Sequence, residues 1–132
     1  MKRTYLCPKC DGVLNPNVKI ILRTERLGRA ALLLLSPQPG NYQVIAPESF
    51  RLKKHDELQF YCPLCSADLT SARNAAMAEI AFSGPSDQRG TVVFSRVMGH
   101  HETYFVTSDE VRPYGEHAAR DTLNFWGAGP RG

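Results

Sequence analysis

The first half of the chain shows a regular alternation of side chains that begins at residue 18. Between Val18 and Arg26 every second residue is apolar or β-branched, and the intervening positions include Lys19, Arg23 and Glu25. A period of two with β-branched residues predicts a half-buried β-strand over residues 18–26. Residues 30–36 are almost entirely apolar, which predicts a partner strand that is buried on both faces.

Turn-forming residues separate these segments from further strand candidates. Proline, glycine and asparagine at 37–41 break the pattern, and short strands are predicted at 42–46 and 57–61. In the second half, strands are predicted over 77–83, 91–98 and 103–107. The alanine-rich stretch 70–78 predicts a short helix with Thr70 or Ser71 as its cap. A helical turn is predicted at 108–110 and a terminal helix over 116–126.

All four cysteines occur in two copies of one short motif. Residues 7–14 and 62–69 both read C-P-x-C-x-x-x-L. Two CxxC pairs predict one tetrahedral metal site, and Zn²⁺ is its usual occupant. Because four thiolates leave no coordination position open to water, the expected role is structural. Iron in an electron carrier is the alternative, since a site of four sulfurs suits either metal.

These motifs resemble the knuckles of zinc-ribbon and rubredoxin-like proteins, in which two C-P-x-C turns lie on adjacent hairpins. The resemblance covers the knuckles and the residues just before them. It implies that one structural Zn²⁺ is held by Cys7, Cys10, Cys62 and Cys65. Family knuckles usually carry glycine after the second cysteine, and the chain departs from this at residues 66–67. The 51 residues between Cys10 and Cys62 also exceed the usual ribbon spacing.

The patterns together predict a mainly β fold. It comprises a zinc-ribbon knot with an inserted antiparallel β-meander, followed by a C-terminal three-stranded β unit with a short helix. The predicted units are residues 1–69 and 70–132, either as two domains or around one shared core. A chain of 132 residues is long enough to bury such a core without disulfides.

Basic residues are concentrated in the first half of the chain. Residues 1–66 contain ten Lys or Arg against five Asp or Glu, whereas residues 67–132 contain six against eight. A partner-binding basic stripe is predicted on the inserted sheet, formed by Lys19, Arg23, Arg26, Arg29, Lys53 and Lys54. Such a stripe suits nucleic-acid phosphates. A solvated sheet face edged by lysine and arginine is the alternative.

Little else in the sequence indicates catalysis or a membrane. No nucleophile elbow, phosphate-binding loop or dinucleotide motif occurs. His100 and His101 are a candidate for a second metal or acid–base site, with a solvated hairpin tip as the alternative. No apolar run approaches the roughly 20 residues that span a bilayer. No secretion signal precedes Cys7, so a cytoplasmic location is expected, where reduced thiols favour metal. A secreted protein with two disulfides is the alternative.

The sequence therefore predicts a non-enzymatic zinc-binding module that presents a β surface to a partner. A protein partner is favoured over nucleic acid, and no small-molecule substrate is indicated. The first alternatives are a rubredoxin-like redox protein and a metal-dependent enzyme that uses the His100–His101 turn. An accessory subunit that is stable only in a larger assembly is a further alternative.

Overall fold

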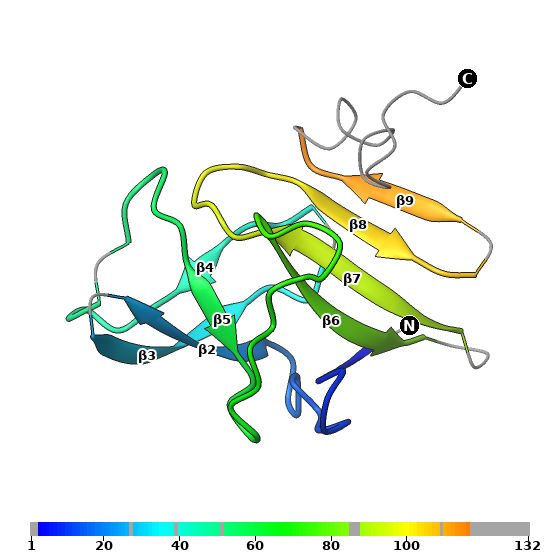
Figure 1. Ribbon diagram of the computed structural model, residues 1–132, viewed down its shortest axis with the longest axis horizontal. Coiled ribbons are helices and arrows are strands. Elements are labelled where there is room, and N and C mark those ends of the chain that lie inside the picture. The colour runs from blue at the N-terminus through cyan, green and yellow to red at the C-terminus, as the bar shows by residue number, and fades with distance from the viewer. Residues whose placement is uncertain are drawn as a thin grey trace.

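A computed structural model describes residues 3–26, 28–38, 40–50, 52–84, 88–108 and 110–116. These residues form nine β-strands, arranged as two antiparallel sheets (Figure 1). They contain no helix, and therefore none long and apolar enough to cross a membrane. The prediction of a mainly β fold is confirmed.

The first half of the chain builds a four-stranded sheet with the order β4-β3-β2-β5. Its strands are β2 (Ile20–Arg26), β3 (Arg29–Leu35), β4 (Val44–Ile45) and β5 (Gln59–Tyr61). Consecutive pairing of β2, β3 and β4 makes the predicted inserted meander, and β5 pairs with the free edge of β2. The alternation predicted for residues 18–26 holds, because alternate residues of β2 are buried.

The second half of the chain builds most of a five-stranded sheet. Its strands β6 (Met77–Ser83), β7 (Arg89–Ser95), β8 (Thr103–Val106) and β9 (Val111–Tyr114) form a second meander. The N-terminal strand β1 (Thr4–Leu6) pairs with β6 and completes the order β1-β6-β7-β8-β9. The predicted three-stranded unit therefore has four strands of its own and one contributed from the N-terminus.

The prediction of a short helix over residues 70–78 is wrong. These residues form bends and a turn that lead into β6. The Ser71 hydroxyl accepts a hydrogen bond from the N–H of Arg73 at 3.1 Å. The Asn74 side chain accepts one from the N–H of Ala76 at 2.9 Å. Local bonds of this kind give the backbone an alternative to helical pairing, which explains the error.

The helical turn predicted at 108–110 includes residue 109, which lies outside the described residues; Ser108 lies in a bend. The N–H of Thr107 donates to the carbonyl of Glu110 at 2.9 Å, and the chain then enters β9. Pro113 lies within this strand, opposite Tyr104. Proline lacks an N–H donor but is tolerated on an edge strand, which is the position of β9 in the sheet. The terminal helix predicted over 116–126 lies outside the described residues beyond Glu116.

Side chains of both sheets meet in one buried cluster. Its members include Tyr5, Leu22, Leu33, Phe60, Ile80, Phe82, Val92 and Phe105, together with Cys7 and Cys62. A smaller cluster lies on the opposite face of the five-stranded sheet and contains Met77, Val93, Tyr104 and Val106. The larger cluster contains residues from both 1–69 and 70–132. The division of the chain into these two units stays a prediction.

The outer face of the four-stranded sheet is largely apolar and partly exposed. The prediction that residues 30–36 are buried on both faces is wrong, because Leu32 is 52% exposed. Register places Ile21, Leu34 and Ile45 in one cross-strand row. A neighbouring row contains Tyr61, Arg23 and Leu32. We refer to these six residues as the outer rows.

Candidate metal centre

The first knuckle, residues 5–14, turns sharply after β1. The N–H of Cys7 donates to the carbonyl of Gly12 at 2.9 Å, and the N–H of Asp11 donates to the carbonyl of Cys7 at 2.9 Å. Asp11 has a φ of +61°. Aspartate is one of the residues that enter this left-handed region most readily, so the turn suits the sequence.

The second knuckle, residues 60–69, repeats this turn after β5. The N–H of Cys62 donates to the carbonyl of Ala67 at 3.0 Å, and the N–H of Ser66 donates to the carbonyl of Cys62 at 2.9 Å. Ser66, which occupies the position of Asp11, has a φ of +65°. The departure from the family pattern at residues 66–67 is therefore accommodated by a serine in a left-handed conformation.

The leucine that ends each motif anchors its knuckle in the core. The N–H of Leu14 donates to the carbonyl of Tyr5 at 2.7 Å, and the N–H of Leu69 donates to the carbonyl of Phe60 at 2.9 Å. All four of these residues are buried. The repeat C-P-x-C-x-x-x-L thus describes a tight turn followed by a return into the core.

Glycine at position 12 lets the two knuckles lie against each other. A Cβ added at Gly12 would collide with the side chain of Leu64 and would lie 3.2 Å from the sulfur of Cys10. The matching position in the second knuckle is Ala67. The first knuckle therefore carries the smaller residue where it meets Leu64 of the second.

The two knuckles bring the four cysteine sulfurs together. All four Sγ atoms lie within 4.8 Å of one another. The Sγ atoms of Cys7 and Cys65 are 3.8 Å apart, as are those of Cys10 and Cys62. A disulfide would need about 2.05 Å, so the arrangement contains no such bond. A tetrahedron with Zn–S distances of about 2.3 Å places its sulfurs about 3.8 Å apart. The four cysteines can therefore hold one metal ion.

Backbone N–H groups of both knuckles point at the sulfurs. The N–H of Lys9 lies 3.3 Å from the sulfur of Cys7. The N–H groups of Leu64 and Cys65 lie 3.3 and 3.4 Å from the sulfur of Cys62. Donors in these positions favour the thiolate, which is the form of cysteine that binds metal.

The first cysteine of each knuckle is buried, whereas the second is exposed. Burial raises the pKa of the Cys7 thiol to about 12, although nearby N–H donors act to lower it. Burial also acts to raise the pKa of Cys62, but the N–H groups of Cys65 and Leu64 and the neighbouring thiols outweigh it, so this pKa is lowered. Binding of an ion must therefore displace a tightly held proton from Cys7.

The sulfur cluster lies where the two sheets meet. Cys7 directly follows β1 of the five-stranded sheet, and Cys62 directly follows β5 of the four-stranded sheet. Both knuckles lie at the lower edge of the view in Figure 1. An ion bound by all four cysteines would therefore cross-link the two sheets at this end.

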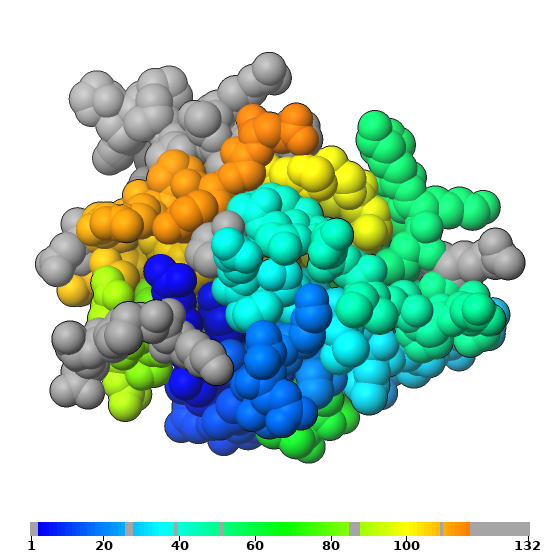
Figure 2. Space-filling view, turned by 180° about the vertical axis from the view of Figure 1, so that it is seen from behind, coloured from blue at the N-terminus to red at the C-terminus, as the bar shows by residue number. Residues whose placement is uncertain are grey.

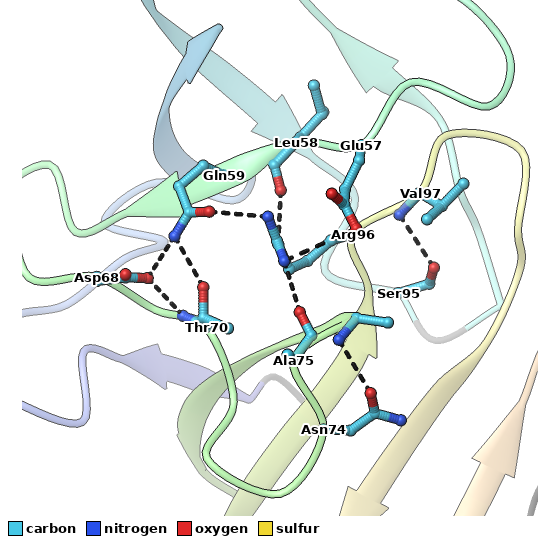
Figure 3. Close-up of polar contacts among 11 residues, drawn as sticks. Glu57, Leu58, Gln59, Asp68, Thr70, Asn74, Ala75, Ser95, Arg96 and Val97 are labelled. Atoms are coloured by element: carbon cyan, nitrogen blue, oxygen red, sulfur yellow. Dashed lines mark hydrogen bonds and ion pairs between the residues drawn. The ribbon is translucent and has the colours of Figure 1, made fainter.

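A polar network supports the second knuckle from the five-stranded sheet (Figure 3). Arg96, which follows β7, is 11% exposed and donates to the carbonyl of Leu58 at 2.8 Å and to the side-chain oxygen of Gln59 at 2.8 Å. Gln59 in turn donates to Asp68 at 2.7 Å and to the hydroxyl of Thr70 at 2.8 Å. This network holds β5 and the return strand of the knuckle together.

The first knuckle has a smaller polar support. The side-chain oxygen of Asn15 accepts a hydrogen bond from the N–H of Tyr5 at 2.8 Å. The side-chain nitrogen of Asn15 donates to the carbonyl of Arg3 at 3.0 Å. One amide side chain therefore ties the end of this knuckle to β1.

The basic residues predicted to form a stripe have different neighbours. The guanidinium of Arg23 lies 4.9 Å from the ring centre of Tyr61 and 3.1 Å from the carboxylate of Glu25. Arg26 and Arg29 are register partners at the end of the β2–β3 hairpin, where the side chain of Arg26 lies outside the described part. Arg23 is thus already engaged by a carboxylate and an aromatic ring.

The predicted lysines of the stripe lie in two separate places. Lys53 and Lys54 belong to a turn, where the side chain of Lys54 lies over Gly99. Lys19 is half-buried and immediately precedes β2. The binding of nucleic acid by these residues stays a prediction.

The two adjacent histidines bind different partners. His100 Nε2 lies 2.8 Å from a carboxylate oxygen of Glu102, whose other oxygen accepts the hydroxyl of Tyr104 at 2.6 Å. The ring of His101 stacks on Tyr42 with 4.4 Å between centroids. In the described part of the chain, neither histidine belongs to a group of three or more side chains that could hold an ion.

Sequence reasoning missed the partnership of Glu102 and Tyr104 with His100. The spacing of these three residues contains the signal, because side chains two apart on extended backbone share a face. The carboxylate of Glu102 joins the side chains of His100 and Tyr104 in one network.

Comparison with known proteins gives no relative for this chain. No family model matches it, and neither a curated protein nor a solved structure does. The likeness to zinc ribbons therefore rests on the two knuckles alone.

Proposed function

We propose that this protein is a non-enzymatic binding module whose two sheets are joined by one structural Zn²⁺. The observation that carries the proposal is the separation of 3.8 Å between the sulfurs of Cys7 and Cys65 and between those of Cys10 and Cys62, which suits tetrahedral Zn²⁺. Cys7, Cys10, Cys62 and Cys65 would be its ligands. They leave no position open to water, so the ion would stabilise the fold rather than catalyse a reaction.

Zinc is favoured over iron because the first half of the chain carries an excess of basic residues. Rubredoxin-like electron carriers usually present an acidic surface, whereas residues 1–66 carry ten basic against five acidic residues. Metal binding by cysteine is favoured where thiols stay reduced, which supports a cytoplasmic location.

The proposed partner surface is the pair of outer rows on the four-stranded sheet, and the proposed partner is a protein. Leu32 and Ile45 are 52% and 51% exposed. A contiguous exposed apolar surface is typical of protein–protein contact sites. Arg23 lies among these residues with its charge offset by Glu25, which suits an apolar contact better than phosphate binding.

Metal analysis of the purified protein tests the zinc assignment. We expect one zinc per chain, a colourless protein and loss of the zinc in Cys62→Ser. The matched control is Ser66→Ala, an exposed change in the same turn that should retain the metal. A red protein containing iron would contradict the assignment.

A pair of substitutions tests the partner surface. In the double variant Leu32→Lys with Ile45→Lys, a protein partner that co-purifies with the wild-type chain in a fixed ratio should be lost. The zinc content should not change. Val18→Lys, at a residue that is 54% exposed and outside the outer rows, should leave this co-purification intact. Retention of the partner by the double variant would place the surface elsewhere. Micromolar binding of oligonucleotides with a steep salt dependence would instead favour the nucleic-acid reading.

A further inference from the structure

An apolar cavity of about 380 Å³ lies between the two sheets. Its inner wall is formed by buried side chains of both sheets: Leu22, Leu33, Phe60, Ile80, Val92 and Phe105. Protein interiors are close-packed, and voids larger than a water molecule are few. Ligand pockets, in contrast, are typically about 300–1,000 Å³. The cavity therefore has the size of a binding site rather than of a packing defect.

Most exposed residues of the cavity lining lie in two loops. One is the segment 40–44 before and within β4, which Figure 2 shows in cyan beside the yellow and orange segments that contain β8 and β9. The Tyr42 hydroxyl ties this segment down through contacts with the Thr103 hydroxyl at 2.8 Å and the carbonyl of Tyr114 at 3.0 Å. The other is the turn with Lys53 and Lys54, which lies against Gly99. These segments form the rim of the cavity.

The charged residues of the lining have one sign. Lys53, Lys54 and Arg96 contribute to it, whereas no aspartate or glutamate does among the described lining residues. The guanidinium of Arg96 is already bound by Leu58 and Gln59. The two lysines are exposed at the rim, so they are the cations that a ligand would meet.

An acid of the same turn accepts a backbone donor. Asp56 accepts the backbone N–H of Lys53 at 2.8 Å, which directs its carboxylate to the backbone of the turn. The two histidines of the lining, His100 and His101, each contact a carboxylate of their own, Glu102 and Glu116. The rim therefore presents two exposed lysines next to an apolar interior.

We propose that this cavity binds a single-chain amphipathic anion. The apolar chain would lie among Leu22, Leu33 and Val92, and the anionic head would lie at Lys53 and Lys54. Burial of the chain supplies most of the favourable free energy. The lysines select the sign of the head group, because a cationic head would be repelled there. The site is separate from the cysteines and from the outer rows.

Calorimetric titration of the full chain with dodecanoate tests the charge preference. We expect saturable one-to-one binding, and binding of dodecyltrimethylammonium that is weaker by about tenfold or more. Lys53→Glu with Lys54→Glu should reverse this preference. Lys19→Glu with Arg29→Glu makes the same change in charge away from the lining and should leave it intact. Absence of saturable binding, or equal affinity for both probes, would overturn the proposal.

Nuclear magnetic resonance of the wild-type complex tests the location without a variant. Intermolecular contacts between the dodecanoate chain and the methyl groups of Leu22, Leu33 and Val92 are expected. Contacts confined to Leu32 and Ile45 would show that the probe binds the outer rows, and would overturn the assignment to the cavity.

Discussion

The first knuckle belongs to the five-stranded sheet and the second to the four-stranded sheet, yet both make the same turn. Asp11 and Ser66 take the same left-handed conformation in the two. Their side-chain supports differ, because the guanidinium of Arg96 braces the second knuckle, whereas the amide of Asn15 ties the first to β1. Residues within a short repeat determine its local geometry, and contacts distant in sequence determine how firmly each copy is held.

The largest expected effect comes from removing a buried ligand. Cys7→Ser and Cys62→Ser should each abolish metal binding and unfold the knuckle region, because structural zinc supplies on the order of 10 kcal/mol in small domains. Both variants should have the same melting temperature as wild-type protein from which a chelator has removed the metal. Zinc content and thermal unfolding measure this. A Cys62→Ser protein that binds no metal and melts like wild type would show that the ion does not stabilise the fold.

Acidification should release the same metal gradually. Burial raises the pKa of Cys7 to about 12, so in the metal-free protein this thiol keeps its proton at neutral pH. Because the bound form carries no such proton, zinc affinity should fall as the pH falls, by about tenfold per unit for each proton displaced. Competition with a calibrated chelator between pH 8 and 6 measures the slope. An affinity independent of pH would be inconsistent with thiolate ligands.

Breaking the brace of the second knuckle should have the next largest effect. Arg96→Leu keeps most of the side-chain volume but removes the donors to Leu58 and Gln59, which should lower the free energy of unfolding by about 2–4 kcal/mol. Arg112→Leu is the matched control, because Arg112 is 64% exposed and pairs with Glu110 on the surface. Urea unfolding compares the two. Equal stability of both variants would show that the hydrogen bonds of Arg96 do not stabilise the second knuckle.

The smaller support of the first knuckle should matter less. Asn15→Ala removes two hydrogen bonds to the backbone near β1 and should destabilise the protein by about 1 kcal/mol. Urea unfolding next to the Arg96 variant tests the order of the two effects. If Asn15→Ala lowers the free energy of unfolding more than Arg96→Leu does, the first knuckle is the more firmly supported of the two.

The smallest effect should be a gain in stability. Ser66→Gly removes the cost of a left-handed serine and should stabilise the protein by up to about 1 kcal/mol. Asp11→Gly should gain less, because aspartate tolerates this conformation better than serine. Melting temperatures of the zinc-loaded proteins measure both. A larger gain at Asp11 would mean that the first turn is more strained than the second, although the two residues have similar φ angles.

Alternation and repetition were the patterns that predicted structure well. The strand over 77–83 has the predicted bounds, and the repeated motif predicted the meeting of four cysteines. Local side-chain bonds at Ser71 and Asn74 defeated the helix prediction, since composition does not reveal them. Pro113 lies within β9, where the edge position accommodates a residue without an N–H donor.

Features that depend on distant pairing could not be predicted from the sequence. β1 is three residues long and exists because it pairs with β6, so its pattern is too short to detect. The pairing of β5 with β2 brings Tyr61 onto Arg23, which removes that arginine from a simple basic stripe. The position of the four cysteines where the two sheets meet, and the cavity between the sheets, follow from these same pairings.

Zinc K-edge X-ray absorption of the purified protein tests the central claim most directly. The account predicts a zinc edge with four sulfur neighbours at about 2.3 Å and no nitrogen or oxygen neighbour. An inner coordination sphere with nitrogen or oxygen, or with fewer than four sulfurs, would contradict a closed structural site that joins the two sheets.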